Sequence, residues 1–244
     1  MNIWGHTDAG RVRSSNQDAY YFELLDDGTR ALIVVCDGMG GAKAGNISIT
    51  LATKAYAEHF KTKYRAGMTA RALESLMKDV LSLTNSDVYN KAKSDENYEG
   101  MGTTLVAAVV SAVGTTIVNV GDSRAYLIDN DGINRVTRDH SLVEDMLQHG
   151  EITELEAKEH PSKNLITRAV GTDAQVQGDV YSLKPSCGSY LLFCTDGLSN
   201  LVTEQEMLYE VLYGGTCDAC PERLAEIANT RGGFDNITTV LAAL

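Results

Sequence analysis

The chain has 244 residues, of which 43% are hydrophobic, and this is enough to bury one large core. The formal net charge of −12 argues against sequence-independent binding of nucleic acid, which depends on lysine and arginine neutralising phosphates. No hydrophobic run approaches the roughly 18 to 20 residues of a membrane span, and no charged-then-apolar leader opens the chain. With only 3 prolines and no Ser/Gly/Pro-rich linker, we expect a single cytoplasmic domain over residues 1–244, monomeric and bound neither to nucleic acid nor to membrane.

Strand-like segments rich in Val, Ile, Leu and Thr are separated by glycine turns, and Gly114 is expected to mark a hairpin. The expected strands cover residues 31–36, 103–110, 115–128, 189–195 and 237–243. Apolar residues spaced three, four and seven apart predict a helix over 69–92. The inner face of this helix is expected to carry Leu73, Leu76, Met77, Val80, Leu81 and Val88. A further helix is expected after "DGMGG", with Ile47, Leu51 and Ala55 pointing inward.

Three more helix starts have capping boxes, in which a hydroxyl and a glutamate three residues later satisfy each other's free backbone amides. These are Ser141 with Glu144, Thr153 with Glu156, and Thr203 with Glu206. The first two lie close together and predict a small helical insertion between the middle strands and "LITRAVG". Because strands and helices do not alternate as in a doubly wound fold, the order favours an α+β protein with mainly antiparallel sheets.

Five aspartates follow apolar runs or stand in glycine-flanked turns. They are Asp18, Asp37, Asp122, Asp196 and Asp235. Any one of them alone is consistent with an ordinary turn. If several met within ~5 Å, each like-charge pair would cost roughly 3 kcal/mol at an effective dielectric constant near 20, so the folded protein would protonate them or bind a cation.

Oxygen ligands without a matching set of His or Cys select hard cations such as Mg²⁺ or Mn²⁺. Two such ions about 3.5 to 4 Å apart can share a water, lower its pKa and direct it at phosphorus. The carbonyl of Gly38, beside Asp37, is a further candidate ligand because glycine lets the backbone approach closely. Arg13, five residues before Asp18, has the planar fork that suits two phosphate oxygens.

Eight motifs that span nearly the whole chain in order resemble the bacterial branch of the type 2C (PPM) metal-dependent serine/threonine phosphatases. They are "RVRSSNQDA", "VVCDGMGG", "GTTLVAAVV", "VNVGDSRAYLI", "RDHSLVEDM", "LITRAVG", "LLFCTDGLSN" and "DNITTV". The resemblance implies a central sandwich of two antiparallel β-sheets flanked by α-helices, with a small mobile flap beside a binuclear Mg/Mn centre. It also implies hydrolysis of phosphoserine and phosphothreonine on proteins, among them a Ser/Thr protein kinase, by a metal-activated water without a covalent intermediate.

Carried over to this chain, the resemblance implies that Asp37 bridges both tightly bound ions, with the Gly38 carbonyl on one of them. Asp196 and Asp235 would hold the other ion. Together these residues would form the two-metal core, filled by Mn²⁺ or Mg²⁺.

The remaining motif residues have roles around that core. Asp18 matches an acid that acts through metal-bound waters, and Asp122 matches the ligand of a third, weaker ion. Arg13 matches the phosphate-binding arginine, which makes Arg13, Asp37 and Asp122 the candidate catalytic residues. The segment of about 139–163 would form the flap.

The chain departs from the pattern at two positions. Met39 stands where many eukaryotic relatives have a histidine that protonates the leaving alkoxide, and a thioether donates no proton. A metal-bound water is one replacement, and His140 is the nearest histidine by motif. Gln17 replaces a common acid before Asp18, so a ligand role at that position is in doubt.

Other interpretations explain fewer of these residues. "GDSRA" resembles a serine-hydrolase elbow around Ser123, with His149 or His160 as the base, but leaves the acids without a role. A haloacid-dehalogenase site needs an aspartate where Val35 stands. A non-enzymatic phosphoprotein reader on the same fold would be expected to lack metal ligands, and none is missing.

The "CDAC" pair, Cys217 and Cys220, has no second cysteine pair or nearby histidine that would complete a closed zinc site. We therefore expect these cysteines to be incidental rather than redox-active.

Overall fold

The computed structural model describes the backbone of residues 1–244 and every side chain except those at positions 42, 43 and 158. The strands are β1 (Asn2–Asp8), β2 (Asp18–Leu25), β3 (Arg30–Met39), β4 (Gly102–Thr103), β5 (Leu105–Ser111), β6 (Thr115–Val120), β7 (Arg124–Asp129), β8 (Gly132–Arg135), β9 (Asp179–Leu183), β10 (Tyr190–Cys194) and β11 (Ile237–Ala243). The helices are α1 (Ala42–Lys63), α2 (Ala70–Lys93), α3 (Leu142–Gln148), α4 (Glu154–Glu159), α5 (Asp196–Ser199), α6 (Glu204–Tyr213) and α7 (Cys220–Thr230), with 3₁₀ turns η1 (Asp26–Gly28) and η2 (Glu96–Tyr98).

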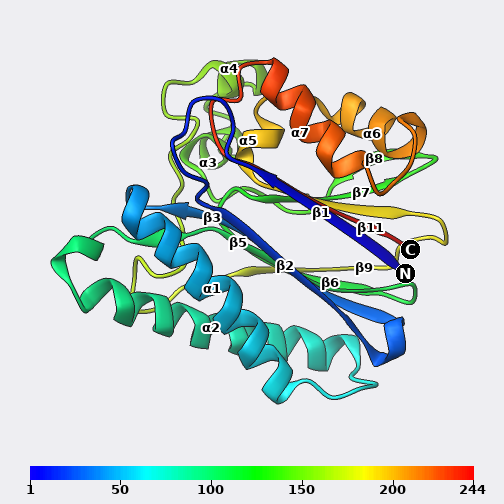
Figure 1. Ribbon diagram of the computed structural model, residues 1–244, viewed down its shortest axis with the longest axis horizontal. Helices are drawn as coiled ribbons and strands as arrows, with labels where there is room; N and C mark the ends of the chain where they lie inside the picture. Colours follow the sequence, from blue (N-terminus) through cyan, green and yellow to red (C-terminus); the bar gives the residue numbers. More distant parts are fainter.

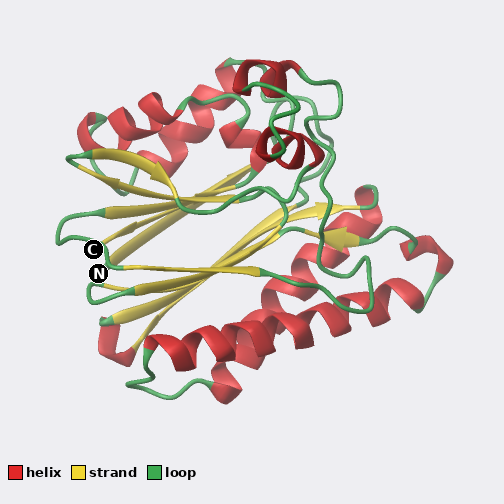
Figure 2. Ribbon diagram, turned by 180° about the vertical axis from the view of Figure 1, so that it is seen from behind, coloured by secondary structure: helices red, strands yellow, loops and turns green.

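The strands form two antiparallel sheets that pack face to face, as expected. One sheet has the order β1-β11-β10-β7-β8, and the other runs β2-β3-β5-β6-β9, with β4 paired to β3. Helices α1 and α2 cover the outer face of the second sheet, while α6 and α7 cover the first (Figure 1). Seen from behind, the same four layers appear as helices, sheet, sheet and helices (Figure 2). The predicted α+β sandwich with flanking helices is confirmed.

The core lies in three layers, one between the sheets and one under each pair of helices. Strand β3 contributes to two of them. Ile33 and Val35 face the other sheet, while Leu32 and Val34 face α1 and α2. Because both faces of this strand are buried, its sequence is a continuous apolar run without alternation.

The long helices follow the predicted periodicity to different degrees. All six residues predicted for the inner face of α2 are buried. In α1, Ala55 is buried, but Ile47 and Leu51 are only half-buried at the edge of the core. The centre of the α1 interface is instead formed by Ala52, Tyr56 and Phe60, since this helix packs through small residues and rings.

The expected single strand over 115–128 is wrong. The chain forms β6, crosses to the other sheet through a turn at Gly121, and continues as β7. Gly121 has φ of +101°, which favours glycine, and the apolar residues on both sides conceal the break in the sequence. Strands β1 and β2 were not predicted, because they lie at sheet edges and are mostly half-buried, so they lack a strong apolar pattern.

The capping boxes at Thr153 and Thr203 are complete. At Ser141 only half of the box forms: the hydroxyl accepts from the Glu144 N–H, whereas the Glu144 carboxylate pairs with Arg135 at 2.9 Å. Among the described residues, no helix has the length and apolar character needed to cross a bilayer.

Candidate active site

The five predicted aspartates stand at or near positions where strands begin or end. The end of β3 and the start of α1 lie on the side of the sandwich away from both chain termini (Figure 1). Asp18 opens β2 and lies directly across the antiparallel ladder from Asp37 in β3. Asp196 is the first residue of α5, just after β10, and Asp235 comes shortly before β11. Asp122 occupies the turn between β6 and β7. Segments far apart in the sequence therefore bring these carboxylates to the same end of the molecule.

Four of these acids line one cavity of about 220 Å³: Asp37, Asp122, Asp196 and Asp235. Its other lining residues are Arg13, Gln17, Gly38, Met39, Thr104, Asn164, Ile166 and Asn236. Asp18 is 5% exposed and is not part of the lining. Except for Asp18, every predicted site residue thus faces or borders the same cavity.

Burial and mutual repulsion disfavour the ionised forms of the carboxylates. Burial raises the pKa of Asp37 well above its usual value, and the charges of Asp18 and Asp196 raise it further. Burial and then the charge of Asp235 raise the pKa of Asp196, while a hydrogen bond with Asp37 works in the opposite direction. Burial, followed by repulsion from Asp196, raises the pKa of Asp122 to about 8. The cavity therefore carries more negative charge than its surroundings neutralise, and it favours a bound cation.

Asp18 is buried outside the cavity lining, and only one of its two carboxylate oxygens has a hydrogen-bond partner among the described residues. Its Oδ2 accepts a hydrogen bond from the Thr195 hydroxyl at 2.8 Å, and that hydroxyl oxygen accepts from the Thr238 N–H at 3.0 Å. The other oxygen, Oδ1, is buried without a hydrogen-bond partner among the described residues. Burial raises the pKa of Asp18 to about 7. A buried carboxylate oxygen without a partner is an atom that a cation, or water bound to one, would satisfy.

Arg13 supplies the positive charge within the cavity lining. Its Nη2 lies 2.8 Å from Oδ2 of Asp235, and the exposed fractions of the two side chains are 52% and 35%. The hydrogen bond to Asp235 is the largest cause that raises the pKa of Arg13, and the charges of Asp37 and Asp196 add to it. The guanidinium thus lies at the cavity mouth, where solvent and a ligand both reach it.

Gly38 borders the cavity at a position where β3 packs tightly against α1. A Cβ at this position would lie 2.7 Å from the Gly45 carbonyl oxygen, 2.8 Å from Ile49 Cγ2 and 3.0 Å from the Gln17 carbonyl oxygen. Only glycine fits between these atoms without displacing backbone. The end of β3 is therefore held close against the start of α1.

The oxygen donors suit a hard cation, although the side chains do not surround a single position as a complete set of ligands. Among the described residues, no three His, Cys, Asp or Glu side chains are grouped so as to hold one ion. Arg13 occupies one oxygen of Asp235, and Asp37 and Asp196 are hydrogen-bonded to each other. Carboxylate oxygens, repulsion between them and the unsatisfied Asp18 oxygen are nevertheless the features that Mg²⁺ and Mn²⁺ would match.

Sequence reasoning missed the hydroxyls that position Asp37 and Asp122. The Asp37 N–H donates to Oγ1 of Thr104 at 3.0 Å, and that oxygen lies 2.7 Å from Oγ of Ser123. Ser123 directly follows Asp122, so the hydroxyl pair connects the strand that carries Asp37 with the turn that carries Asp122. Polar residues at the ends of apolar strands, as in "GTTL", are the only sequence signal for it.

Asn236 was missed as well. Its Oδ1 accepts from the Gln17 N–H at 2.8 Å, and its Nδ2 donates to the Ala9 carbonyl at 2.9 Å and the Ser15 carbonyl at 3.0 Å. It therefore fixes the loop that carries Arg13 against the segment that carries Asp235. Gln17 itself donates through Nε2 to the Gly41 carbonyl at 2.9 Å, which is a structural contact.

His140 is not positioned to protonate a leaving group. It is 4% exposed and does not line the cavity. Nδ1 accepts from the Gly121 N–H at 3.1 Å, and Nε2 lies 3.3 Å from Oδ2 of Asp179. Burial, the largest cause, lowers its pKa. Both ring nitrogens are therefore engaged away from the cavity.

The segment predicted as a flap contains α3 and α4 and lies beside the acid cluster. Two residues just after it, Asn164 and Ile166, reach the cavity lining. Ile166 also pairs with Ser141 in an isolated antiparallel bridge, which closes the base of the segment. The residues that follow the segment therefore form part of the cavity wall, whereas the described residues of 139–163 do not line the cavity.

The competing nucleophiles are not placed for catalysis. Ser123 is fully buried and shares its hydroxyl with Thr104. His149 lies on the flap, where Nδ1 contacts the Asp145 carbonyl oxygen at 2.8 Å. Cys220 is buried, and burial raises its pKa to about 12, which keeps the thiol protonated.

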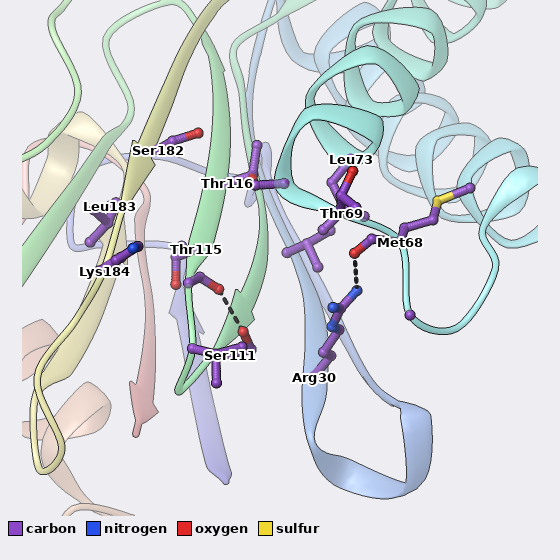
Figure 3. A pocket seen from close by; sticks show the side chains of 15 residues that line it. Arg30, Met68, Thr69, Leu73, Ser111, Thr115, Thr116, Ser182, Leu183 and Lys184 are labelled. Atoms are coloured by element: carbon purple, nitrogen blue, oxygen red, sulfur yellow. Dashed lines mark hydrogen bonds between the residues drawn. The ribbon is translucent and has the colours of Figure 1, made fainter.

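A larger cavity of about 450 Å³ lies at the opposite end of the sandwich, between the α1–α2 connection and the ends of β5, β6 and β9 (Figure 3). Within it, Arg30 donates to the Met68 carbonyl at 3.1 Å, and Ser111 donates to the Gly114 carbonyl at 2.6 Å. No carboxylate is among the described residues that line it. Of the two cavities, the smaller one is therefore the one lined by the predicted aspartates.

Comparison with known proteins identifies the family of the chain. Residues 7–227 match the family described as Protein phosphatase 2C. The chain is similar to the serine/threonine phosphatase Stp of Listeria innocua, with 37% identity over 242 residues that cover 99% of this chain and 95% of the relative. It also resembles the crystal structure of serine/threonine phosphatase Stp1 from Staphylococcus aureus, with a TM-score of 0.91, 34% identity, and coverage of 99% and 94% of the two chains. The catalytic domain of the phosphatase PstP, solved in complex with 2 manganese ions, is similar with a TM-score of 0.85, 29% identity, and coverage of 99% and 97%.

Proposed function

The chain belongs to the protein phosphatase 2C family and is a serine/threonine phosphatase of that type, and from this premise we propose that it hydrolyses phosphoserine and phosphothreonine on proteins in a reaction that depends on Mn²⁺ or Mg²⁺. The observation that carries the proposal is the acidic cavity. Four aspartates and one arginine from distant segments line it together, and a fifth aspartate, Asp18, is the cross-strand partner of Asp37.

Divalent cations in this cavity would neutralise the crowded carboxylates, lower the pKa of a water and polarise the phosphoryl group. The residues proposed to hold two tightly bound ions are Asp37, Asp196, Asp235 and the Gly38 carbonyl. Asp18, with its unsatisfied Oδ1, would accept a hydrogen bond from a coordinated water. Burial and mutual repulsion raise the pKa values of Asp37 and Asp196, and this favours such a role, because a bound positive charge would offset the repulsion.

Arg13 is proposed to bind the substrate phosphate. Its guanidinium is half-exposed at the cavity mouth, and its planar fork suits two phosphate oxygens. Binding would move the guanidinium from Asp235 to the phosphate, which releases the Asp235 carboxylate for a cation. The same side chain thus links substrate binding to the charge state of the site.

Asp122 is proposed to serve the leaving group, because Met39 lines the cavity and has no proton to donate. Its carboxylate faces the cavity but is not needed for the two-ion core, so it is available to hold a third, weaker ion. The serine alkoxide released from a phosphoserine substrate needs a proton as it leaves, whereas the p-nitrophenolate released from p-nitrophenyl phosphate barely does.

We propose direct hydrolysis without a covalent intermediate. Thr104 has the one hydroxyl side chain among the described lining residues, and this hydroxyl is hydrogen-bonded to the Asp37 N–H and to Ser123 and so is not placed as a nucleophile.

Residues 139–163 are proposed to act as a flap within a single domain spanning 1–244. From the resemblance to the family, we also propose that the enzyme is cytoplasmic and monomeric and that its substrates include a Ser/Thr protein kinase.

Hydrolysis of a phosphoserine peptide and of p-nitrophenyl phosphate, with Mn²⁺ and with excess chelator, tests the proposal. We expect turnover only with the cation. Calorimetry should show that Mn²⁺ binds to the native chain and binds much more weakly to Asp196→Asn. Asp129→Asn is the matched control, since Asp129 caps a surface turn by accepting from the Asp131 N–H at 2.9 Å. Substantial turnover in chelator, or equal Mn²⁺ binding by both variants, would contradict the proposal.

A further inference from the structure

His140 stands at a junction between the Asp122 turn, the flap and strand β9. It is 4% exposed, and neither the carboxylate cluster nor the proposed chemistry makes direct use of it. We propose that His140 is a positioning residue that locks the turn carrying Asp122 and joins this turn to the base of the flap. The inference rests on the proposed function, because Asp122 is the group through which His140 would act.

The hydrogen bonds define which nitrogen of the imidazole carries the proton. The Gly121 N–H donates to Nδ1 at 3.1 Å, so Nδ1 is the acceptor. Nε2 then carries the hydrogen and points at Oδ2 of Asp179, 3.3 Å away. Arg168 Nη1 donates to the other Asp179 oxygen at 3.2 Å and also lies 3.3 Å from His140 Nε2, so the carboxylate and the arginine together orient this side of the ring.

The backbone of His140 reinforces the same contact. Its N–H donates to the Gly121 carbonyl at 2.9 Å, so the peptide groups on both sides of the Gly121 Cα bond to one residue. On the other side, the Thr167 N–H donates to the His140 carbonyl at 2.8 Å. His140 therefore joins the first residues of the flap, the residues just after it and the Asp122 turn.

The turn is held equally firmly on its opposite side. Gly121 adopts φ of +101°, and a Cβ there would lie 2.6 Å from Thr104 Cγ2. Thr104 in turn bonds Ser123 and the Asp37 N–H. Asp122 is thus fixed between a hydroxyl pair that leads to Asp37 and an imidazole that leads to the flap. Loss of the imidazole would leave the Gly121 N–H without its acceptor, while the backbone bond from His140 and the Asp37 side of the turn would remain.

Two amide substitutions separate the functions of the two ring nitrogens. In His140→Asn, the side-chain oxygen can reach the position of Nδ1 and still accept from the Gly121 N–H. In His140→Gln, the longer side chain reaches the position of Nε2 and retains only the contacts with Asp179 and Arg168. We expect amide hydrogen exchange in residues 119–124 to be at least tenfold faster in His140→Gln and within threefold of wild type in His140→Asn. This readout needs neither metal nor substrate.

A double-mutant cycle tests whether His140 acts through Asp122. With a phosphoserine peptide and Mn²⁺, we expect His140→Gln to lower kcat at least tenfold with KM within threefold, and His140→Asn to recover most of kcat. In an Asp122→Asn background, His140→Gln should cause no further loss. An equal loss in both backgrounds, or equal defects in the Asn and Gln variants, would overturn the inference.

Asp179→Ala provides a second route if His140→Gln does not fold. Asp179 is at the surface, with a side chain 38% exposed, and its loss leaves Nε2 without its acceptor. Exchange in residues 119–124 should again accelerate, and unchanged exchange would count against the inference. His59→Gln is the matched control, because His59 pairs with Asp87 at 2.7 Å on the outer helices, and we expect wild-type exchange and kinetics. If the wild-type protein does not hydrolyse phosphopeptides, the proposed function fails, while hydrogen exchange still tests the position of His140.

Discussion

Arg13 and Asp235 lie 222 positions apart in the sequence and form an ion pair, with 2.8 Å between Nη2 of Arg13 and Oδ2 of Asp235. The sequence motifs assign these residues to different partners, a phosphate for the arginine and a cation for the aspartate. In the structure each neutralises the other. Substrate and cation would therefore replace this pair together, which makes the arginine part of both binding events.

Replacing Arg13 with alanine should weaken substrate binding more than catalysis. We expect KM for a phosphopeptide to rise at least tenfold, which corresponds to about 1.4 kcal/mol, because a bidentate charged contact is lost. Inhibition by inorganic phosphate should weaken in parallel, and Arg13→Lys should restore part of the affinity through its charge. Steady-state kinetics check this, and wild-type KM and phosphate inhibition in Arg13→Ala would show that the arginine is only a surface residue.

Asp37→Asn should abolish turnover and stabilise the cation-free fold. Asp37 faces repulsion from Asp18 and Asp196, so removing its charge relieves an unfavourable interaction. We expect the melting temperature in chelator to rise by roughly 2–4 °C, equivalent to about 1 kcal/mol for a chain of this size. The increase in melting temperature on adding Mn²⁺ should largely disappear. Retained activity, or a cation-free protein that melts well below wild type, would contradict the assignment.

The cation-free protein should lose stability as pH rises. The pKa in the folded state is about 7 for Asp18 and about 8 for Asp122, both above the unfolded value near 3.9. The folded state therefore binds more protons than the unfolded state, and its advantage is lost as pH rises through these folded values. Between pH 6.5 and 8.5 we expect the melting temperature in chelator to fall by several degrees.

Two comparisons isolate the cause of that pH dependence. Mn²⁺ should flatten it, because a bound cation favours the ionised carboxylates. Asp18→Asn should also reduce it, since one of the two raised pKa values is removed. A melting temperature that rises with pH in chelator would contradict the charge arrangement described for the cavity.

The sequence predicted the acids but not how they are supported. Asp37 and Asp196 were recognisable because each ends a buried apolar strand, where a carboxylate has no structural reason to be. Thr104 and Asn236 gave no such signal, since their partners lie far away in the chain and depend on the pairing of particular strands. The pairing of Arg13 with Asp235 was equally inaccessible, because it requires two loops from opposite ends of the chain to meet.

The same reasoning explains where the fold was predicted well. The inner face of α2 was correct because its apolar residues repeat with the helical period. The change of sheet at Gly121 was missed because β6 and β7 are both apolar, and hydrophobicity alone does not say which sheet a strand joins. That missed turn carries Asp122, so the least predictable part of the fold positions one of the site residues.

Gly38→Ala should destabilise the protein and disturb the site. The new Cβ would lie 2.7 Å from the Gly45 carbonyl and 2.8 Å from Ile49, so β3 and α1 would have to separate. We expect a loss of about 1–3 kcal/mol in the free energy of unfolding, measured by urea denaturation, with weaker Mn²⁺ binding. Gly114→Ala is the matched control, because its Cβ would meet only the Leu183 carbonyl oxygen at 3.8 Å. Equal stability of the two variants would contradict the close approach at Gly38.

Asp122→Ala should distinguish a role in leaving-group departure from a role in the turn. The carboxylate reaches the cavity, its pKa is raised to about 8 by burial and by Asp196, and the neighbouring Met39 offers no proton. If Asp122 serves the leaving group, the variant should keep its fold and its tight Mn²⁺ binding but lose most of kcat on phosphoserine peptides. The loss on p-nitrophenyl phosphate should be at least tenfold smaller, because that leaving group barely needs a proton. A plain turn residue predicts lower stability and equal losses on both substrates. Kinetics on the two substrates, together with the melting temperature and Mn²⁺ titration of the same variant, therefore decide between the two roles.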